Sequence, residues 1–364
     1  MNRRQCIGFA GALALTPLVR ATTPDRYNTA LAAFPDFSGV VVAGTGSKIL
    51  YSQGIGKADP QAGTPLTIST RFESGSVSKW IASIVVMKMV DLGLLKLDEP
   101  IIRYLPAYRA DTGSQLTLRH LLSHSSGVPN DVSAARKADP SLAYTELDQM
   151  EAVKRYASGD LAFKPGTEWD YSHSNWLIVK AVVEQTSGKS YADCLQQWVL
   201  APLKLGESGL FSGESSAVPG MAVAYSAANP PFERKVNAIP GYMAMAGGFY
   251  ASAPDMLRLM DGVLGGRVLS PDAQQVLMRV QMPKQRYALG GRTQVELIAG
   301  QMREAAWEDG SNGGFRLVAR RVLADGQSVI VMNHTSYPHQ KVGHIASALM
   351  DVSYGFEPST SSKA

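Results

Sequence analysis

The sequence predicts an α+β fold, with an antiparallel sheet built from both ends of the chain and a mostly helical domain inserted between them. Near both termini, short β-branched runs are joined by glycine-containing turns, whereas the middle of the 364-residue chain carries apolar residues at helical spacing. Strands at the two ends of a chain most simply pair in one sheet. We therefore expect a sheet domain of residues 22–80 and 285–357, flanked by helices, and a mostly helical domain of residues 81–284.

The first 21 residues predict a secretory signal peptide. Arg3 and Arg4 precede an apolar, alanine-rich run over residues 7–18, and residues 19–21 end in a small residue suited to cleavage. The run is too short to cross a membrane as a helix, and no later stretch has eighteen apolar residues. The paired arginines favour twin-arginine export over the general secretory route, and either route gives a periplasmic or secreted protein. A serine-rich tail, residues 358–364, is expected to be disordered.

The charge of the chain argues against nucleic-acid binding, and its cysteine content argues against an intramolecular disulfide. Removal of the first 21 residues takes away three arginines and no acid, so the formal charge falls from +4 to +1, and no run of lysine or arginine remains. The chain therefore lacks the electrostatic surface of a nucleic-acid-binding protein. Cys194 is the one cysteine of the mature chain, which rules out an intramolecular disulfide, and its apolar helical pattern favours a core position.

Two expected strands are followed by a core helix whose first turn carries a serine and a lysine. Residues 37–43 and 49–51 predict two strands joined by a glycine-rich turn. The apolar run over residues 81–95 is too long for a buried strand and predicts a core helix. Ser76 stands at the start of this helix. Lys79 is the one lysine of the chain with a serine three residues before it, and this spacing puts both side chains on one helix face.

A serine and a lysine in this position favour nucleophilic catalysis. The unpaired N–H groups at the start of a helix stabilise negative charge that develops nearby. A serine hydroxyl is a poor nucleophile until a base takes its proton, and a partly desolvated lysine can take it or help another group to do so. Ser-x-x-Lys alone is a common pattern, so a helix that carries both residues by chance is the alternative.

The next helix carries two histidines at a spacing that metal sites use. Thr117 is expected to cap a helix that contains His120 and His124, four residues apart. A zinc-protease helix would have a glutamate directly after the first histidine, where this chain has Leu121. We therefore interpret both histidines as packing residues and expect no metal and no other cofactor.

The remaining elements follow from breakers and apolar periodicity. Pro202 should end a helix at residues 200–201, and Ser270-Pro271 should start another. After Arg286 the pattern changes to strands, with a hairpin turn at Asp325-Gly326. The expected elements are helices over residues 176–183, 191–200 and 341–352, and strands over residues 287–290, 315–322 and 328–332.

The ordered motifs resemble the serine β-lactamase and penicillin-binding-protein superfamily, and most closely its branch of class C β-lactamases, carboxypeptidases, esterases and D-aminopeptidases. The resemblance covers nearly the whole mature chain, so it implies a β-lactamase-like fold. The motifs that carry it are Glu73-Ser74-Gly75-Ser76-Val77-Ser78-Lys79, His120 to Gly127, Pro165-Gly166 leading into Tyr171-Ser172, and Ala246-Gly247-Gly248 leading into Ala253-Pro254-Asp255-Met256.

The resemblance implies roles for matching residues. Ser76 matches the nucleophile that forms an acyl-enzyme, and Lys79 matches the lysine that shares or relays its proton. Tyr171 matches the tyrosine that acts as general base and then as acid toward the leaving group. A phenol has a pKa of about 10, so the Lys79 ammonium would have to lower the pKa of Tyr171 for it to act as a base near neutral pH. Two N–H groups should hold the oxyanion, one from Ser76 and one from Ser311.

Two positions depart from the family pattern. Members usually have asparagine two residues after the tyrosine, where this chain has His173. Asn175 matches a second asparagine, and His173 either contacts the substrate or points away. The third family motif, a lysine or histidine followed two residues later by glycine, corresponds here to Glu308 and Gly310. Because a like-charge contact at ~4 Å and an effective dielectric of ~20 costs about 4 kcal/mol, this acidic motif predicts a site that disfavours carboxylate substrates.

These observations predict a periplasmic serine hydrolase that cleaves small-molecule esters, amides or peptides through a Ser76 acyl-enzyme. An esterase is the first choice, a D-amino-acid amidase or peptidase the second, and a class C-type β-lactamase the third. The alternative from another class is a non-catalytic, penicillin-binding-like sensor or scaffold, which would not need Ser76, Lys79 and Tyr171 together. No nucleic acid and no membrane span are expected, and the oligomeric state stays open.

Overall fold

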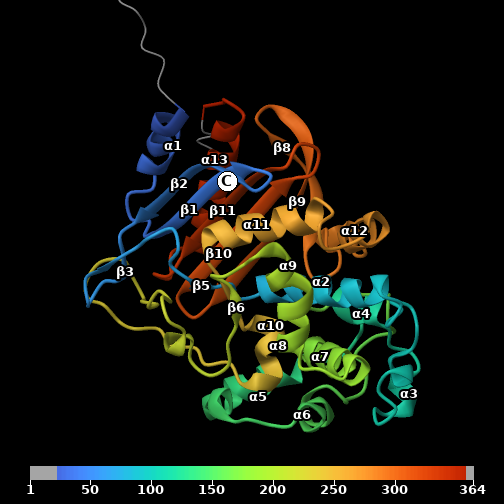
Figure 1. Ribbon diagram of the computed structural model, residues 1–364. Helices are drawn as coiled ribbons and strands as arrows, with labels where there is room; N and C mark the ends of the chain where they lie inside the picture. The colour runs from blue at the N-terminus through green and yellow to red at the C-terminus, as the bar shows by residue number, and fades with distance from the viewer. Residues whose placement is uncertain (1–22, 358–364) are drawn as a thin grey trace, which may run out of the picture.

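A computed structural model describes residues 23–357 and shows a six-stranded antiparallel sheet with helices on both faces (Figure 1). The strand order is β2-β1-β11-β10-β9-β8, so strands from the two ends of the chain pair at β1 and β11, which confirms the predicted sheet. The bounds are Gly39–Thr45 (β1), Lys48–Ile55 (β2), Arg292–Ile298 (β8), Gln301–Asn312 (β9), Phe315–Val322 (β10) and Gln327–Asn333 (β11).

Helices cover the two faces of the sheet. On one face lie α1 (Thr23–Ala32) and α13 (His339–Ser353), with their own apolar core. The other face contacts α2 (Val77–Asp91) and α11 (Ala253–Leu264), and the core there continues into the helical part of the molecule. The helix α11 lies in the range assigned to the mostly helical domain, but it packs on the sheet. The division of the chain into two domains remains a prediction.

The predicted strand over residues 287–290 is wrong, and β8 and β9 were missed. Tyr287 forms only isolated bridges, to Met282 and Arg292. In β8 the apolar residues Val295 and Leu297 are exposed, so the strand does not show the inward apolar pattern from which strands are predicted. The strand is one arm of a hairpin with β9, joined by the two-residue turn Ala299-Gly300, in which both residues have positive φ.

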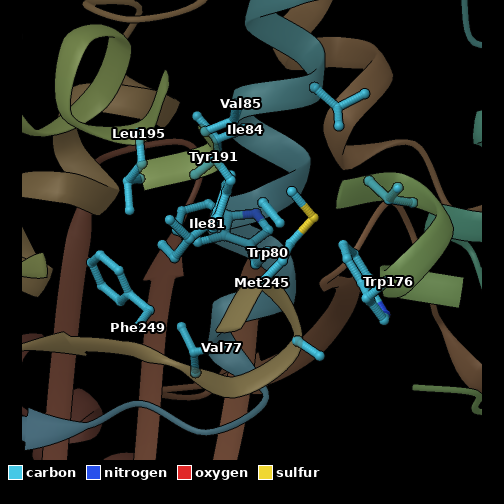
Figure 2. Close-up of a cluster of buried hydrophobic side chains, with 14 of the residues drawn as sticks. Val77, Trp80, Ile81, Ile84, Val85, Trp176, Tyr191, Leu195, Met245 and Phe249 are labelled. Atoms are coloured by element: carbon cyan, nitrogen blue, oxygen red, sulfur yellow. The ribbon is translucent and has the colours of Figure 1, made fainter. Parts of the chain in front are cut away.

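The helix α2 is buried on almost every side, as expected of a helix that is apolar all round. Figure 2 shows its side chains packed among residues of the helical part and of the strand β7. This packing fixes the first turn of α2, where Ser76 and Lys79 lie. The labelled residues of this core are Val77, Trp80, Ile81, Ile84, Val85, Trp176, Tyr191, Leu195, Met245 and Phe249.

Local capping explains several helix bounds. Thr117 Oγ1 accepts a hydrogen bond from His120 N at the start of α4 (Leu118–Leu122), and Ser270 Oγ accepts one from Ala273 N at the start of α12 (Pro271–Met278). Both predicted starts are confirmed. The predicted stop before Pro202 is wrong, because a π-helical turn lets the chain continue into α9 (Ala201–Leu203).

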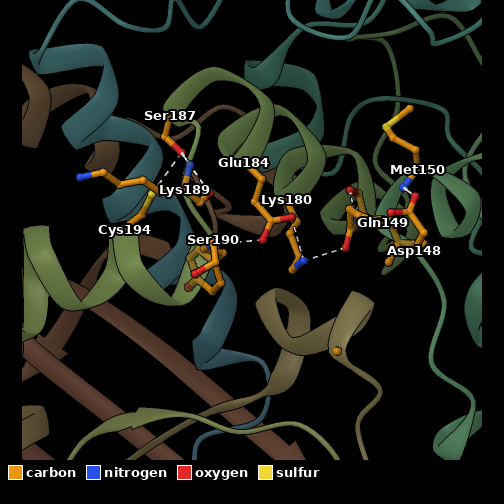
Figure 3. A network of polar contacts seen from close by, with 12 residues as sticks. Asp148, Gln149, Met150, Lys180, Glu184, Ser187, Lys189, Ser190 and Cys194 are labelled. Carbon is orange, nitrogen blue, oxygen red and sulfur yellow. Dashed lines mark hydrogen bonds and ion pairs between the residues drawn. The ribbon is translucent and has the colours of Figure 1, made fainter.

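A polar network ties three helices of the helical part together (Figure 3). Lys180 Nζ on α7 (Ser174–Ser187) donates to Gln149 Oε1 and Glu184 Oε2, each at 2.9 Å, and the backbone N of Tyr191 donates to Glu184 Oε1 at 3.0 Å. These bonds join α7 to α6 (Gln149–Tyr156) and α8 (Tyr191–Leu195). Cys194 is fully buried beside this network, which confirms its core position.

The shorter elements complete the chain. They are β3 (Lys57–Asp59), β4 (Thr64–Pro65), β5 (Phe72–Glu73), α3 (Ala110–Gly113), α5 (Asp131–Ala138), β6 (Gly209–Leu210), α10 (Ala244–Gly247) and β7 (Phe249–Ala251). No helix within residues 23–357 is both long and apolar enough to cross a membrane. The predicted signal peptide and the predicted tail both lie outside the described residues.

Candidate active site

Ser76 lies between the side chains of Lys79 and Tyr171. The Tyr171 hydroxyl donates a hydrogen bond to Ser76 Oγ at 2.8 Å. Lys79 Nζ lies 3.3 Å from the same oxygen and donates to the backbone oxygen of Ala246 at 2.8 Å. Ser76 is half-buried and Lys79 is buried. The structure therefore brings Tyr171 to the Ser76–Lys79 pair, although Tyr171 lies 95 positions after Ser76 in the sequence.

The loop before Ser76 approaches the end of β9 so closely that glycine is required on both sides. Gly75 has a φ of 52°, a backbone conformation that favours glycine. A Cβ on Gly310 would lie 1.8 Å from Ser74 O, and a Cβ on Gly75 would lie 2.6 Å from Ser311 N. The backbone of Ser311 therefore lies beside the loop that precedes Ser76, where its N–H can act with that of Ser76 as an oxyanion donor.

The last residues of β9 form a free sheet edge over the site. The pairing of β8 with β9 ends at Arg292 opposite Trp307, so residues 308–312 pair only with β10. A cavity of about 460 Å³ opens along this edge and contains Ser76 and Tyr171. The cavity is also lined by Arg292, Glu308, Asp309, Gly310, Ser311, Arg316, Ser336, Tyr337, Pro338 and His339.

Burial changes the acid–base properties of Lys79 and Tyr171 in opposite directions. Desolvation lowers the pKa of Lys79 to about 7, although the carboxyl group of Glu308 opposes this shift. Desolvation raises the pKa of Tyr171 above its usual value of 10, and the hydrogen bond with Ser76 offsets only part of that shift. The expectation that Lys79 lowers the pKa of Tyr171 is therefore wrong, and Lys79 is the group that can be neutral near pH 7.

The acidic third motif lines the cavity and has basic side chains beside it. Arg292 Nη1 lies 3.2 Å from Glu308 Oε1 and 3.2 Å from Asp309 Oδ1, and His339 Nε2 lies 2.5 Å from Asp309 Oδ2. Burial raises the pKa of Glu308 to about 8. The sequence argument missed Arg292, which lies on the unpredicted strand β8. The predicted repulsion of carboxylates assumed a motif without a neighbouring positive charge, and which substrate charge the site prefers stays a prediction.

His173 and Asn175 lie outside the residues that line the cavity. His173 Nδ1 contacts Ser133 Oγ at 3.0 Å. Asn175 is fully buried, accepts a hydrogen bond from Ser126 Oγ at 2.7 Å and donates one to Leu121 O at 3.2 Å. Asn175 therefore holds the two neighbouring segments together, and a role of either residue in substrate contact stays a prediction.

His124 supports Tyr171 from behind. Its ring stacks on the Tyr171 ring with 4.2 Å between the centroids, and its Nδ1 accepts a hydrogen bond from Ser172 N at 3.1 Å. Burial and the nearby Lys79 lower the pKa of His124 well below its usual value, so the ring is neutral. The packing role expected for His124 is confirmed. Within residues 23–357 no cluster of three or more histidine, cysteine or acidic residues could hold a metal ion.

Glu73 joins the loop that precedes Ser76 to the end of β9. This buried carboxylate accepts hydrogen bonds from Ser215 Oγ and from Asn312 Nδ2, and Asn312 Oδ1 accepts one from Asn237 Nδ2. Burial raises the pKa of Glu73 to about 7. The sequence contains Glu73 in the first motif, but its partners are 142 and 239 positions away, so no local pattern predicts the link.

Comparisons with known proteins agree with this fold. The family model described as Beta-lactamase matches residues 28–351. Esterase EstB of Burkholderia gladioli is 30% identical over 257 residues, which cover 62% of this chain and 64% of that protein, so the chain spans less than two thirds of that relative's length. Among solved structures, the octameric penicillin-binding protein homologue from Pyrococcus abyssi has a TM-score of 0.77, with 21% identity over 92% of this chain and 77% of that chain. The D-amino acid amidase from Ochrobactrum anthropi has a TM-score of 0.75, with 19% identity over 90% of this chain and 98% of that chain.

Proposed function

The chain belongs to the beta-lactamase family, and from this premise we propose that it is a periplasmic serine hydrolase that cleaves carboxylic esters or amides through an acyl-enzyme on Ser76. The observation that carries the proposal is the contact of Ser76 Oγ with both the Tyr171 hydroxyl and Lys79 Nζ. A scaffold or sensor would not need a buried amine with a pKa of about 7 beside a serine. The periplasmic location rests on the sequence of residues 1–21.

In the acylation step, Lys79 acts as the base. Its neutral amine takes the proton from Ser76 Oγ while that oxygen attacks the substrate carbonyl carbon. The N–H groups of Ser76 and Ser311 hold the oxyanion that forms. When the bond to the leaving group breaks, Tyr171 gives its proton to the departing oxygen or nitrogen and regains one from the Lys79 ammonium. Water then attacks the acyl-enzyme while the proton transfers run in the reverse order. Ser76 Oγ regains its proton and the carboxylic acid product is released.

An ester is the favoured substrate for a chemical reason. Because burial raises the pKa of Tyr171, its hydroxyl is a weak acid, and a leaving group that needs little protonation departs more easily. Alcohols and phenols fit this requirement better than amines. The 30% identity with esterase EstB supports the same choice. The second candidate is a D-amino-acid amidase, which is supported by the likeness in fold to the amidase from Ochrobactrum anthropi.

A comparison of three chromogenic substrates tests this choice. We expect the purified mature protein to hydrolyse p-nitrophenyl butyrate with a higher kcat/KM than D-alanine p-nitroanilide or nitrocefin. A preference for the anilide would make the protein an amidase, and a preference for nitrocefin would make it a β-lactamase. Absence of turnover with all three would favour the non-catalytic sensor or scaffold.

The pH dependence of hydrolysis should follow Lys79. Only the neutral amine can accept the serine proton, and the pKa of Lys79 is about 7. We therefore expect kcat/KM for p-nitrophenyl butyrate to rise about tenfold per pH unit below pH 7 and to level off above it, because a base with that pKa gains its active form as pH increases. Initial rates from pH 5 to 8.5, corrected for spontaneous hydrolysis, measure this profile. A profile that is flat across this range would contradict the role of Lys79 as base.

A further inference from the structure

The two N–H groups assigned to the oxyanion come from segments that are far apart in the sequence. Ser76 is the N-cap of α2, whereas Ser311 lies near the end of β9. Residues 308–312 have no partner residue in β8, and within the described part of the chain no backbone hydrogen bond joins them to residues 73–76. A contact other than sheet pairing must therefore fix the position of one donor relative to the other.

A steric limit and a hydrogen bond act together between the two segments. A Cβ on Gly310 would lie 1.8 Å from Ser74 O, so the backbones already lie as close as glycine permits. This contact limits their approach but does not hold them together. The hydrogen bond from Asn312 Nδ2 to Glu73 Oε2 does hold them. Because Ser311 directly precedes Asn312, the bond acts one residue away from the oxyanion donor.

Both ends of this hydrogen bond are fixed by further contacts. Glu73 belongs to β5, which pairs with β7, and its other carboxylate oxygen accepts a hydrogen bond from Ser215 Oγ. The amide of Asn312 is held from its other side, because its Oδ1 accepts a hydrogen bond from Asn237 Nδ2. Glu73 is only 4% exposed, and its carboxylate has no cation beside it among residues 23–357. A buried carboxylate without a cation costs folding free energy, and such costs are typical of functional sites.

Glu73 and Asn312 can act on the reaction only indirectly, because neither residue lines the Ser76 cavity. An oxyanion hole works when both N–H groups lie at hydrogen-bond distance from the oxygen as its charge develops. A displacement of about 1 Å can reduce the rate by about a hundredfold. A bond that fixes the end of β9 against the loop before Ser76 therefore has a direct consequence for the transition state.

We propose that Glu73 is a positioning residue for the oxyanion hole, and that through Asn312 it holds the Ser311 N–H in place beside that of Ser76. This inference rests on the proposed hydrolase function. It adds to that function a residue that acts on the transition state without contacting the substrate.

The test measures kcat/KM for p-nitrophenyl butyrate together with the affinity for butaneboronic acid. The boron binds Ser76 Oγ, whose proton passes to Lys79, and the tetrahedral boronate anion keeps both its oxygens, one of which takes the oxyanion position. Glu73→Ala should lower both quantities by about 10- to 100-fold, less than the 10²- to 10³-fold loss that follows removal of a donor. The fall should appear in kcat, with little change in KM, because the lost interaction is made only in the transition state.

Two further variants separate the hydrogen bond from a general effect of mutation. In Glu73→Gln the amide oxygen can still accept from Asn312 Nδ2 while the amide nitrogen donates to Ser215 Oγ, so both quantities should stay within about threefold of wild type. Asn312→Ala should reproduce the loss seen in Glu73→Ala. The double variant should lose no more than either single variant, because both changes break the same bond.

Glu184→Ala is the matched control. Glu184 also joins two segments, since it accepts hydrogen bonds from Lys180 Nζ and from the backbone N of Tyr191, and it does not line the cavity. Its replacement should lower the temperature of thermal unfolding. At a temperature where the variant is folded, kcat/KM and the affinity for butaneboronic acid should equal those of wild type.

Each outcome decides the proposal. If folded Glu73→Ala keeps the wild-type values, or if the losses of the two single variants add in the double variant, Glu73 only stabilises the fold and the proposal is wrong. If Glu73→Ala does not fold, Asn312→Ala decides in the same way.

The boronic acid also separates this proposal from the proposed hydrolase function. If the wild-type protein hydrolyses no ester, calorimetric titration with butaneboronic acid still measures the oxyanion hole. Weaker binding to Glu73→Ala than to wild type would then uphold the positioning role and refute the hydrolase. Equal binding would refute the positioning role, and absence of binding to the wild-type protein would refute both proposals.

Discussion

Replacement of Ser76 by alanine should lower kcat/KM for p-nitrophenyl butyrate by about five orders of magnitude or more, which is the usual effect of removing a catalytic nucleophile. Within the described residues, Ser76 Oγ is the cavity hydroxyl that contacts both the Tyr171 hydroxyl and Lys79 Nζ. The variant should remain folded, since Ser76 is only half-buried and the core around α2 does not depend on its hydroxyl.

The measurement is steady-state hydrolysis of the ester, with thermal unfolding as a check that the variant is folded. Ser69→Ala is the control, because Ser69 is exposed and bonds to Thr67 Oγ1 away from the cavity. Retention of more than a tenth of the wild-type activity in a folded Ser76→Ala protein would show that another residue is the nucleophile.

Replacement of Lys79 by methionine should lower kcat/KM by about 10²- to 10⁴-fold, the range expected when a general base is removed. Methionine has a similar length and is apolar, so it fits the buried position and removes a group whose charged form burial disfavours. The residual activity should also lose the rise through pH 7, because the titrating amine is gone.

Lys88→Met provides the control on the same helix. Lys88 Nζ donates to Val268 O at 2.9 Å and does not line the cavity. Its replacement should keep both the activity and the pH profile. If Lys79→Met keeps an activity that still rises through pH 7, a different group supplies the base.

The central helix and the reactive pair follow from the sequence because they depend on local spacing. A long apolar run predicts the buried helix α2, and a serine and a lysine three positions apart must share one face of its first turn. The hairpin of β10 and β11 is equally local, since Asp325-Gly326 marks its turn. The position of Tyr171 beside Ser76 came from the family resemblance, because no spacing rule connects residues 95 positions apart.

The electrostatics of the site could not be predicted because they arise from tertiary contacts. Arg292 reaches Glu308 only through the pairing of β8 with β9, and β8 has an inverted apolar pattern. The direction of the pKa shift of Tyr171 depends on how far the phenol is buried, which the sequence does not encode locally. The family pattern assigns Glu308 and Gly310 to the third motif, and the structure shows both lining the cavity.

The most direct test of the acyl-enzyme on Ser76 is the intact mass of the mature protein after incubation with a fluorophosphonate. We predict a single phosphonate adduct on the wild-type protein and none on Ser76→Ala under the same conditions, because the reagent phosphonylates a serine whose proton a neighbouring base removes. An adduct of equal yield on Ser76→Ala, or no adduct on the wild-type protein, would contradict the assignment of Ser76 as the activated nucleophile.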